Sequence, residues 1–162
     1  MNDKPTLGLY AGSFDPFHIG HLDVVKQAAD TGAFDVIMVA KGINSSKLVP
    51  GKVSDRFPLP KNWLATFHKD IEIKVDTYTT LLADYVKELE NDYYNVTLIR
   101  GLRNGSDLQY EQNLVTFLKG MHPTIKVVFF SCDPKFQHIS SSALRDIRHF
   151  SDAEYKKYVI TD

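Results

Sequence analysis

The chain has 162 residues, a length typical of one domain around a single core, so we expect one domain over residues 1–162. Its 19 basic and 20 acidic residues nearly cancel, which argues against a large phosphate-tracking surface for nucleic acid. Cys132 is the single cysteine, so an internal disulfide is excluded, and the apolar runs are too short to span a bilayer. The N-terminus lacks the apolar stretch of a signal peptide, so the sequence predicts a cytoplasmic protein without a membrane partner.

Short apolar runs alternate with amphipathic stretches along the chain. This pattern predicts a single-domain α/β fold with a mainly parallel, five-stranded sheet covered by helices on both faces. In sheets of this kind ligands bind beyond the carboxyl ends of the strands, where the strand order reverses. The predicted strands are 7–10, 36–40, 71–75, 96–99 and 127–130, and the predicted helices are 20–29, 81–89, 106–121 and 141–150.

The junction between the first strand and the first helix is predicted to bind an anion. Gly12 and Pro16 favour a turn, and the free N–H groups and positive dipole end of the following helix favour a phosphate. Gly20 has no Cβ to block the approach of that phosphate, and His18 and His21 add two imidazoles that face the same space.

Other interpretations of this junction remain open. The two histidines also fit a metal site, but zinc requires three or four protein ligands and no cysteine or further histidine lies nearby in the sequence. They also fit structural histidines at a helix end. Ser13 fits an N-cap or turn residue, and Asp15 fits a turn residue that bonds its own backbone.

The stretch after the second strand is the least regular part of the chain. Prolines and a glycine within residues 48–61 oppose a continuous helix, so we predict a loop over the site. From the residues alone, Lys47 fits a solvated loop lysine better than a phosphate ligand, and Lys41, nearer the strand end, competes with it for the phosphate-binding role.

Arginines follow the fourth strand, and serines follow the fifth. Arg100 and Arg103 flank a glycine turn, and their forked guanidinium groups suit phosphate oxygens, although surface charge is the alternative. The three serines 140–142 fit a simple helix N-cap, which is itself an anion site, and their hydroxyls suit the phosphates of a nucleotide. Glu111 also fits a solvated helix face.

These motifs together resemble a known family. The segment from Gly12 to His21 is similar to the signature of the nucleotidylyltransferase superfamily. Together with the segments 100–103, 107–111 and 139–142, it resembles the bacterial-type phosphopantetheine adenylyltransferase family, in order and with similar spacing from about residue 7 to 147. The resemblance implies a Rossmann-like fold and transfer of an adenylyl group from ATP, with Mg²⁺, to 4′-phosphopantetheine by direct in-line attack. It also implies a homohexamer.

The resemblance implies roles for individual residues. His21, Lys47 and Arg103 would be catalytic, with His21 giving a hydrogen bond, charge-assisted if the ring is protonated, to the α-phosphate. The acceptor would be bound by Ser13, Lys47, Leu82 and Arg100. ATP would be bound by Ser13, Phe14, His18, His21, Gly101, Leu102, Arg103, Glu111, Phe136, Ile139, Ser140, Ser141 and Ser142.

Two other functions fit the sequence. One is a related nucleotidylyltransferase that acts on nicotinamide mononucleotide or an alcohol phosphate. The other is a nucleotide-binding regulator without turnover. The chain also departs from the family's pattern after residue 150, where a Pro-x-x-Val turn is expected and Ser151–Tyr155 stands instead.

Overall fold

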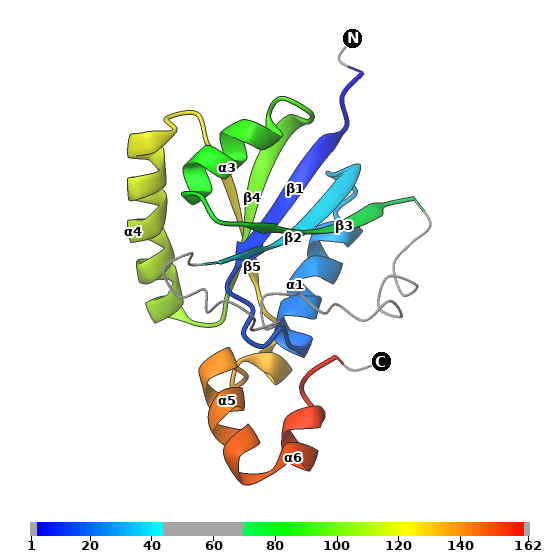
Figure 1. Ribbon diagram of the computed structural model, residues 1–162, viewed down its shortest axis with the longest axis vertical. Coiled ribbons are helices and arrows are strands. Elements are labelled where there is room, and N and C mark those ends of the chain that lie inside the picture. Colours follow the sequence, from blue (N-terminus) through cyan, green and yellow to red (C-terminus); the bar gives the residue numbers. More distant parts are fainter. Residues whose placement is uncertain (1–2, 44–69, 161–162) are drawn as a thin grey trace.

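The computed structural model describes residues 3–43 and 70–160. Within these ranges a parallel sheet is flanked by helices, and two further helices close its carboxyl edge (Figure 1). Lys47 and the predicted loop 48–61 lie outside the described residues. The elements in chain order are β1 (Thr6–Gly12), α1 (Ile19–Asp30), β2 (Val36–Gly42), β3 (Glu72–Tyr78), α3 (Leu82–Leu89), β4 (Tyr94–Leu102), α4 (Gly105–Met121), β5 (Lys126–Ser131), the short 3₁₀ helix η3 (Pro134–Phe136), α5 (Ser141–Phe150) and α6 (Asp152–Lys156).

The sheet has the order β3-β2-β1-β4-β5, with every neighbouring pair parallel. The chain moves outward from β1 to β3 and then returns to the other side of β1 with β4. The order therefore reverses between β1 and β4, which makes the carboxyl ends of these two strands the expected place for a ligand. The predicted parallel α/β sheet of five strands is confirmed.

Alternating side chains of the strands divide the core into two layers. On one face, Leu9 of β1 and Met38 of β2 lie in a cluster with Ala83 and Val86 of α3 and with Leu118 of α4. On the other face, Ile37 of β2 and Ile99 of β4 pack against Val24, Val25 and Ala28 of α1. Both faces of the sheet are thus covered, as the near-continuous apolar runs predict for central parallel strands.

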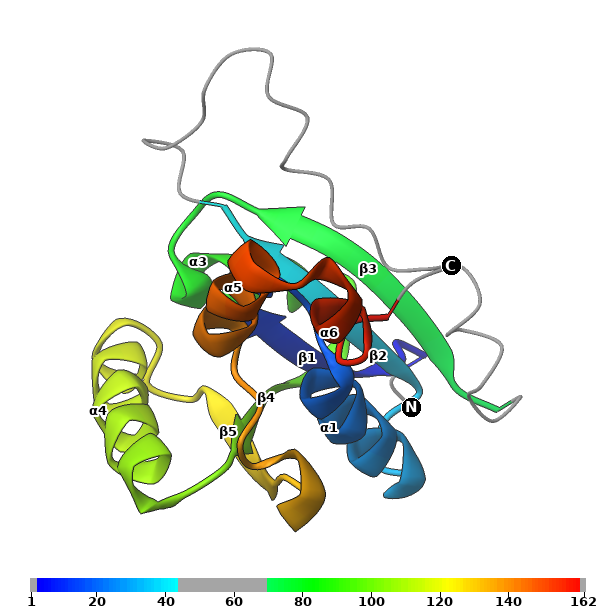
Figure 2. The ribbon, with the colours of Figure 1, turned by 90° about the horizontal axis from the view of Figure 1, so that it is seen from below.

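The C-terminal helices occupy the carboxyl edge of the sheet. Figure 2 looks at that edge from below, with α5 and α6 in front of the strands and α1 beside them. After α6 the chain reaches the start of α1, where Val159 forms an antiparallel bridge with His18 and the Tyr158 carbonyl accepts from the Ile19 N–H at 2.9 Å. Ile160 packs beside the α1 layer of the core. The segment that follows α6 thus helps to hold the beginning of α1.

Candidate active site

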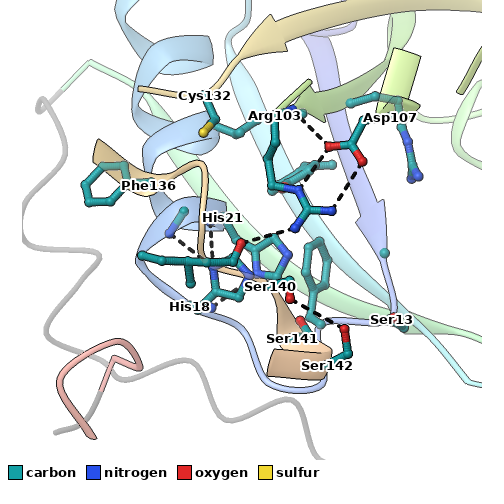
Figure 3. Close-up of a pocket in the computed structure, with 18 of the residues that line it drawn as sticks. Ser13, His18, His21, Arg103, Asp107, Cys132, Phe136, Ser140, Ser141 and Ser142 are labelled. Atoms are coloured by element: carbon teal, nitrogen blue, oxygen red, sulfur yellow. Dashed lines mark hydrogen bonds and ion pairs between the residues drawn. The ribbon is translucent and has the colours of Figure 1, made fainter. Parts of the chain in front are cut away.

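A cavity of about 430 Å³ opens at the carboxyl ends of β1 and β4, where the strand order reverses. It brings together the turn before α1, the end of β4, the start of α4 and the start of α5 (Figure 3). The expected site residues that line it are Ser13, Phe14, His18, His21, Arg100, Gly101, Arg103, Glu111, Phe136, Ile139, Ser140, Ser141 and Ser142.

The start of α1 differs from the sequence prediction. His18 is the N-cap, and its Nδ1 accepts from the backbone N–H groups of Gly20 at 3.1 Å and His21 at 3.4 Å. The Ile19 N–H donates to the Tyr158 carbonyl, and the Leu22 N–H donates to the His18 carbonyl. These first-turn donors are satisfied within the protein, so the prediction that they are free to bind a phosphate is wrong. Gly20 makes room for an imidazole instead, because a Cβ there would lie 3.0 Å from His18 Cε1.

His21 is held in one tautomer by the same turn. Its Nδ1 accepts from the His18 N–H at 3.1 Å, so the proton of the neutral ring sits on Nε2. The ring stacks on His18 with centroids 3.7 Å apart, and it contacts Phe14 edge to face. Burial, followed by the charges of His18, Arg103 and Arg100, lowers the pKa of His21 well below its usual value. His21 is thus a neutral N–H donor, and the charge-assisted form of its expected hydrogen bond does not fit the free protein.

The same turn should make stability depend on pH. Burial and the Arg103 charge lower the pKa of His18 from 6.5 to about 4. Between these two pKa values, His18 is protonated in the unfolded chain but neutral in the folded protein. The free energy of unfolding should therefore fall as the pH drops from about 6.5 towards 4, by up to about 3 kcal/mol for this ring. Urea unfolding at several pH values measures this dependence of the free energy of unfolding on pH. Asparagine also caps helices, so His18→Asn should unfold with a flatter pH dependence; identical dependences would contradict the account.

Arg100 and Glu111 form a buried ion pair across the cavity wall. Arg100 Nε and Nη2 donate to the two carboxylate oxygens of Glu111 at 2.7 and 2.8 Å, and Nη1 donates to the Ala11 carbonyl at 2.7 Å. The side chains are 18% and 9% exposed. The solvated-face interpretation of Glu111 is therefore wrong, and Arg100 is not a surface charge.

Arg103 is paired in a similar way, but in a more open position. Its Nε and Nη2 donate to Asp107 at 3.0 and 3.2 Å, and its Nη1 donates to the Ile139 carbonyl at 3.4 Å (Figure 3). Partial burial raises the pKa of Asp107, but the hydrogen bonds from Arg103 outweigh burial, and the net shift is downward. Arg103 thus links the start of α4 to the loop that precedes α5.

The serines start α5 at the mouth of the cavity. Ser140 is the N-cap, with its hydroxyl accepting from the Ala143 N–H at 3.2 Å, and the Ser141 hydroxyl donates to the Pro16 carbonyl at 2.9 Å. The N-cap interpretation is therefore right for Ser140. The first-turn N–H groups of Ser141 and Ser142 have no acceptor inside their own helix. This makes the start of α5, rather than the start of α1, the helix end suited to an anion.

Some expected residues lie away from the cavity. Leu82, expected to bind the acceptor, packs against the core layer on the α3 face of the sheet and does not line the cavity. Leu102 follows Gly101 in β4, and its carbonyl accepts from the Cys132 N–H at 2.8 Å, but its side chain does not line the cavity.

Sequence reasoning missed several residues that line the cavity. Arg145 follows Ser141 by four residues, which places both on one helix face, and its Nη1 donates to the Asp15 carbonyl at 2.6 Å. Asp107 precedes Glu111 by four residues on α4, which was a visible signal for a second carboxylate. Tyr110 lies in the segment 107–111 that carries the resemblance, but no role was predicted for it, and Cys132 gave no signal, since only the folded chain brings it to the cavity.

Neither a metal cluster nor a membrane span is found in the part of the chain that the structure describes. Within residues 3–43 and 70–160, no three side chains among His, Cys, Asp and Glu gather where they could hold a metal ion. In the same ranges, none of the helices combines the length and apolarity that crossing a membrane requires.

Comparisons with known proteins show the family to which the chain belongs. Residues 9–147 match the cytidylyltransferase-like family model. Phosphopantetheine adenylyltransferases of Streptococcus pyogenes serotypes M5 (strain Manfredo) and M1 are each 40% identical over 147 residues, covering 91% of this chain and 85% of theirs.

Among solved structures, the nicotinic acid mononucleotide adenylyltransferase of Plasmodium falciparum complexed with APC matches with a TM-score of 0.59 and 20% identity, covering 96% of this chain and 90% of that one. A bifunctional NMN adenylyltransferase/ADP ribose pyrophosphatase of Francisella tularensis matches with a TM-score of 0.58 and 14% identity, covering 98% of this chain and 45% of that one. At these identities the structures establish the fold alone. The family model and the 40% identity over nine-tenths of the chain identify it as a member of the cytidylyltransferase-like family and, within it, of the phosphopantetheine adenylyltransferases.

Proposed function

We propose that this protein transfers the adenylyl group of ATP to the phosphate of 4′-phosphopantetheine, forming dephospho-coenzyme A and pyrophosphate. The observation that carries the proposal is that His21, Arg103 and the serines of α5 line one cavity. The chain that holds this cavity is 40% identical to proteins named phosphopantetheine adenylyltransferase. Substrate positioning and fixed hydrogen-bond donors are the main requirements for moving a phosphoryl or nucleotidyl group.

The reaction is a single in-line displacement. An oxygen of the acceptor phosphate attacks the α-phosphorus of ATP, the bond to the β-phosphate breaks, and pyrophosphate leaves with that electron pair. The Nε2–H of His21 stabilises charge on the α-phosphate in the transition state, and the ring need not give up its proton. Arg103 and the start of α5 hold the β- and γ-phosphates.

The acceptor is bound on the β1 side of the cavity in this proposal. Ser13, Lys47 and Arg100 hold its phosphate, and Lys47 is included on the family resemblance alone. Leu82 lines the pantetheine arm only if the arm extends over α3, beyond the cavity that His21 lines.

We propose that Mg²⁺ enters with ATP. Magnesium retains several waters and binds substrate phosphates readily, so it does not need a dedicated cage of side chains. The donors at the start of α5 are hydroxyl and N–H groups, which suit phosphate oxygens better than a cation. Cytoplasmic localisation, without membrane or nucleic-acid partners, is proposed from the absence of a disulfide and the balanced charge.

We also propose a homo-oligomer, as the family resemblance implies a hexamer. The support is a stripe of exposed apolar residues on α4, with Tyr110 67%, Phe117 73% and Met121 41% exposed. Their spacing puts them on one helix face. Sedimentation velocity should give a mass several times that of one chain, and Phe117→Glu should lower it; a wild-type monomer at micromolar concentration would contradict the assembly.

The activity is tested by incubating the protein with ATP, Mg²⁺ and 4′-phosphopantetheine while following pyrophosphate release. Release that requires both substrates supports the proposal. ATP binding without release would favour the nucleotide-binding regulator instead.

A further inference from the structure

The hydroxyl of Tyr10 is a buried polar group that the proposed reaction does not use. Tyr10 belongs to β1, is only 5% exposed and lines the cavity. Within residues 3–43 and 70–160, its hydroxyl forms no hydrogen bond. Buried hydroxyl groups nearly always have a partner, because a buried hydroxyl without one costs free energy. The Tyr10 hydroxyl is therefore available to a ligand in the cavity.

This hydroxyl lies at a wall of the cavity formed by Val24, Gly101 and Cys132, which we call the neutral wall. A Cβ on Gly101 would lie 3.8 Å from the Tyr10 hydroxyl oxygen and 2.8 Å from Val24 Cγ2, so β1, β4 and α1 meet there. Figure 3 shows Cys132 at the far end of the site from the serines of α5. Uncharged side chains suit the sugar and base of a nucleotide better than its phosphates.

The phenol of Tyr10 keeps its proton. Burial raises the pKa of Tyr10 well above its usual value; the Arg100 charge opposes this effect, while Glu111, Cys132 and Asp23 add to it. A neutral phenol can donate one hydrogen bond and accept another. A ribose hydroxyl has the same two capacities, whereas a phosphate oxygen only accepts.

The Tyr10 ring also lies beside the group that faces the α-phosphate in the proposed reaction. Its centroid is 6.3 Å from that of His21 and 5.0 Å from that of Phe14, in both cases edge to face. In the proposed reaction the β- and γ-phosphates extend from His21 towards α5. The ribose is attached to the other side of the α-phosphate, so it extends towards the neutral wall.

We propose that the Tyr10 hydroxyl forms a hydrogen bond with a hydroxyl group of the ATP ribose. This inference rests on the proposed function, to which it adds a residue that makes the site prefer ribonucleotides to deoxyribonucleotides. The bond replaces the partner that the described residues do not supply. Its contribution is therefore made when the nucleotide binds and not when the chain folds.

The test uses Tyr10→Phe, which removes the hydroxyl and keeps the ring. Isothermal titration in the presence of Mg²⁺ gives Kd for ATP, 2′-deoxy-ATP and 3′-deoxy-ATP with the wild type and the variant. Tyr10→Phe should weaken ATP about tenfold, the factor expected for one hydrogen bond. It should change Kd for one of the two deoxy analogues less than about twofold, because that analogue already lacks the partner. At saturating ATP, kcat should be unchanged.

Tyr85→Phe is the matched control. Tyr85 is also 5% exposed, but its hydroxyl donates to Asp76 Oδ2 at 2.7 Å, and it does not line the cavity. Tyr85→Phe should therefore lower the unfolding midpoint and leave all three Kd values unchanged. Tyr10→Phe should leave the unfolding midpoint of the free protein unchanged or raise it, because no hydrogen bond within the described chain is lost.

Several results would overturn the inference. An unchanged Kd for ATP in Tyr10→Phe would mean that the hydroxyl does not bind the nucleotide. Equal weakening of all three nucleotides would mean that it binds a phosphate or the base, and a lowered unfolding midpoint would mean that it has a partner in the protein. The wild type gives a test that needs no variant, since equal Kd values for ATP and both deoxy analogues would also contradict the ribose contact.

The two proposals can fail separately. A wild type that binds ATP without turnover of 4′-phosphopantetheine would overturn the proposed function. The three Kd values would still decide whether Tyr10 contacts the ribose, since titration with nucleotide alone requires no acceptor.

Discussion

Replacing His21 with alanine should lower kcat by about two orders of magnitude or more, on the scale of roughly 3 kcal/mol for a lost transition-state donor. The His18 N–H holds the ring through Nδ1, and the depressed pKa keeps it neutral, so its Nε2–H is a fixed donor that needs no reorganisation. Because the charge on the α-phosphate develops mainly in the transition state, KM for ATP should change little. Steady-state kinetics over a range of ATP concentrations gives both constants.

His149→Ala is the matched control for this variant. His149 is exposed near the end of α5 and does not line the cavity, so its loss should leave both constants unchanged. A preserved kcat with a raised KM in His21→Ala would make His21 a ground-state binding residue.

Replacing Arg100 with alanine should have the largest effect on stability. It would leave the Glu111 carboxylate, only 9% exposed, without the partner that donates to both of its oxygens. Removing one member of a buried ion pair costs about 3–5 kcal/mol, because the remaining charge stays desolvated and unpaired. Urea denaturation of the wild type and the variant measures the loss.

The Arg103–Asp107 pair provides the comparison. The Arg103 and Asp107 side chains are 37% and 24% exposed, so water can solvate the Asp107 carboxylate when Arg103 is removed. Arg103→Ala should therefore lower the free energy of unfolding by no more than about 1 kcal/mol. The double change Arg100→Met with Glu111→Leu should recover most of the stability, since no charge is left buried. Equal losses in the two alanine variants, or no recovery in the double variant, would contradict the buried pair.

The sheet and its main helices could be predicted from the sequence because each depends on local apolar periodicity. The predicted helix 141–150 coincides with α5, and the predicted strand 96–99 lies inside β4. The strand ends were harder, because backbone pairing extends past the apolar run. β3 continues from Val75 through Asp76 and Thr77 to Tyr78, all hydrogen-bonded to β2 in regular register. The short helix α6 was missed, although Ser151 caps it with its side chain.

The sequence predicted which residues line the candidate site better than it predicted the contacts between those residues. The motifs do meet in one cavity, since each follows a strand whose carboxyl end reaches the same edge. The sequence could not indicate that His18 would cap its own helix, because that depends on the rotamer of one side chain and on the carbonyl that Tyr158 brings from the C-terminus. Nor could it indicate that Glu111 would turn inward to Arg100, since an amphipathic pattern does not distinguish a buried carboxylate from a solvated one.

The identity of the acceptor is the most direct test of the proposed function. The protein is incubated with ATP, Mg²⁺ and a panel of acceptor phosphates, namely 4′-phosphopantetheine, nicotinamide mononucleotide and glycerol 3-phosphate, and the adenylylated products are identified by mass. We expect dephospho-coenzyme A as the main product, its formation to reverse when pyrophosphate is added, and little product from the other two acceptors. Adenylylation of nicotinamide mononucleotide with none of phosphopantetheine would contradict the proposed function.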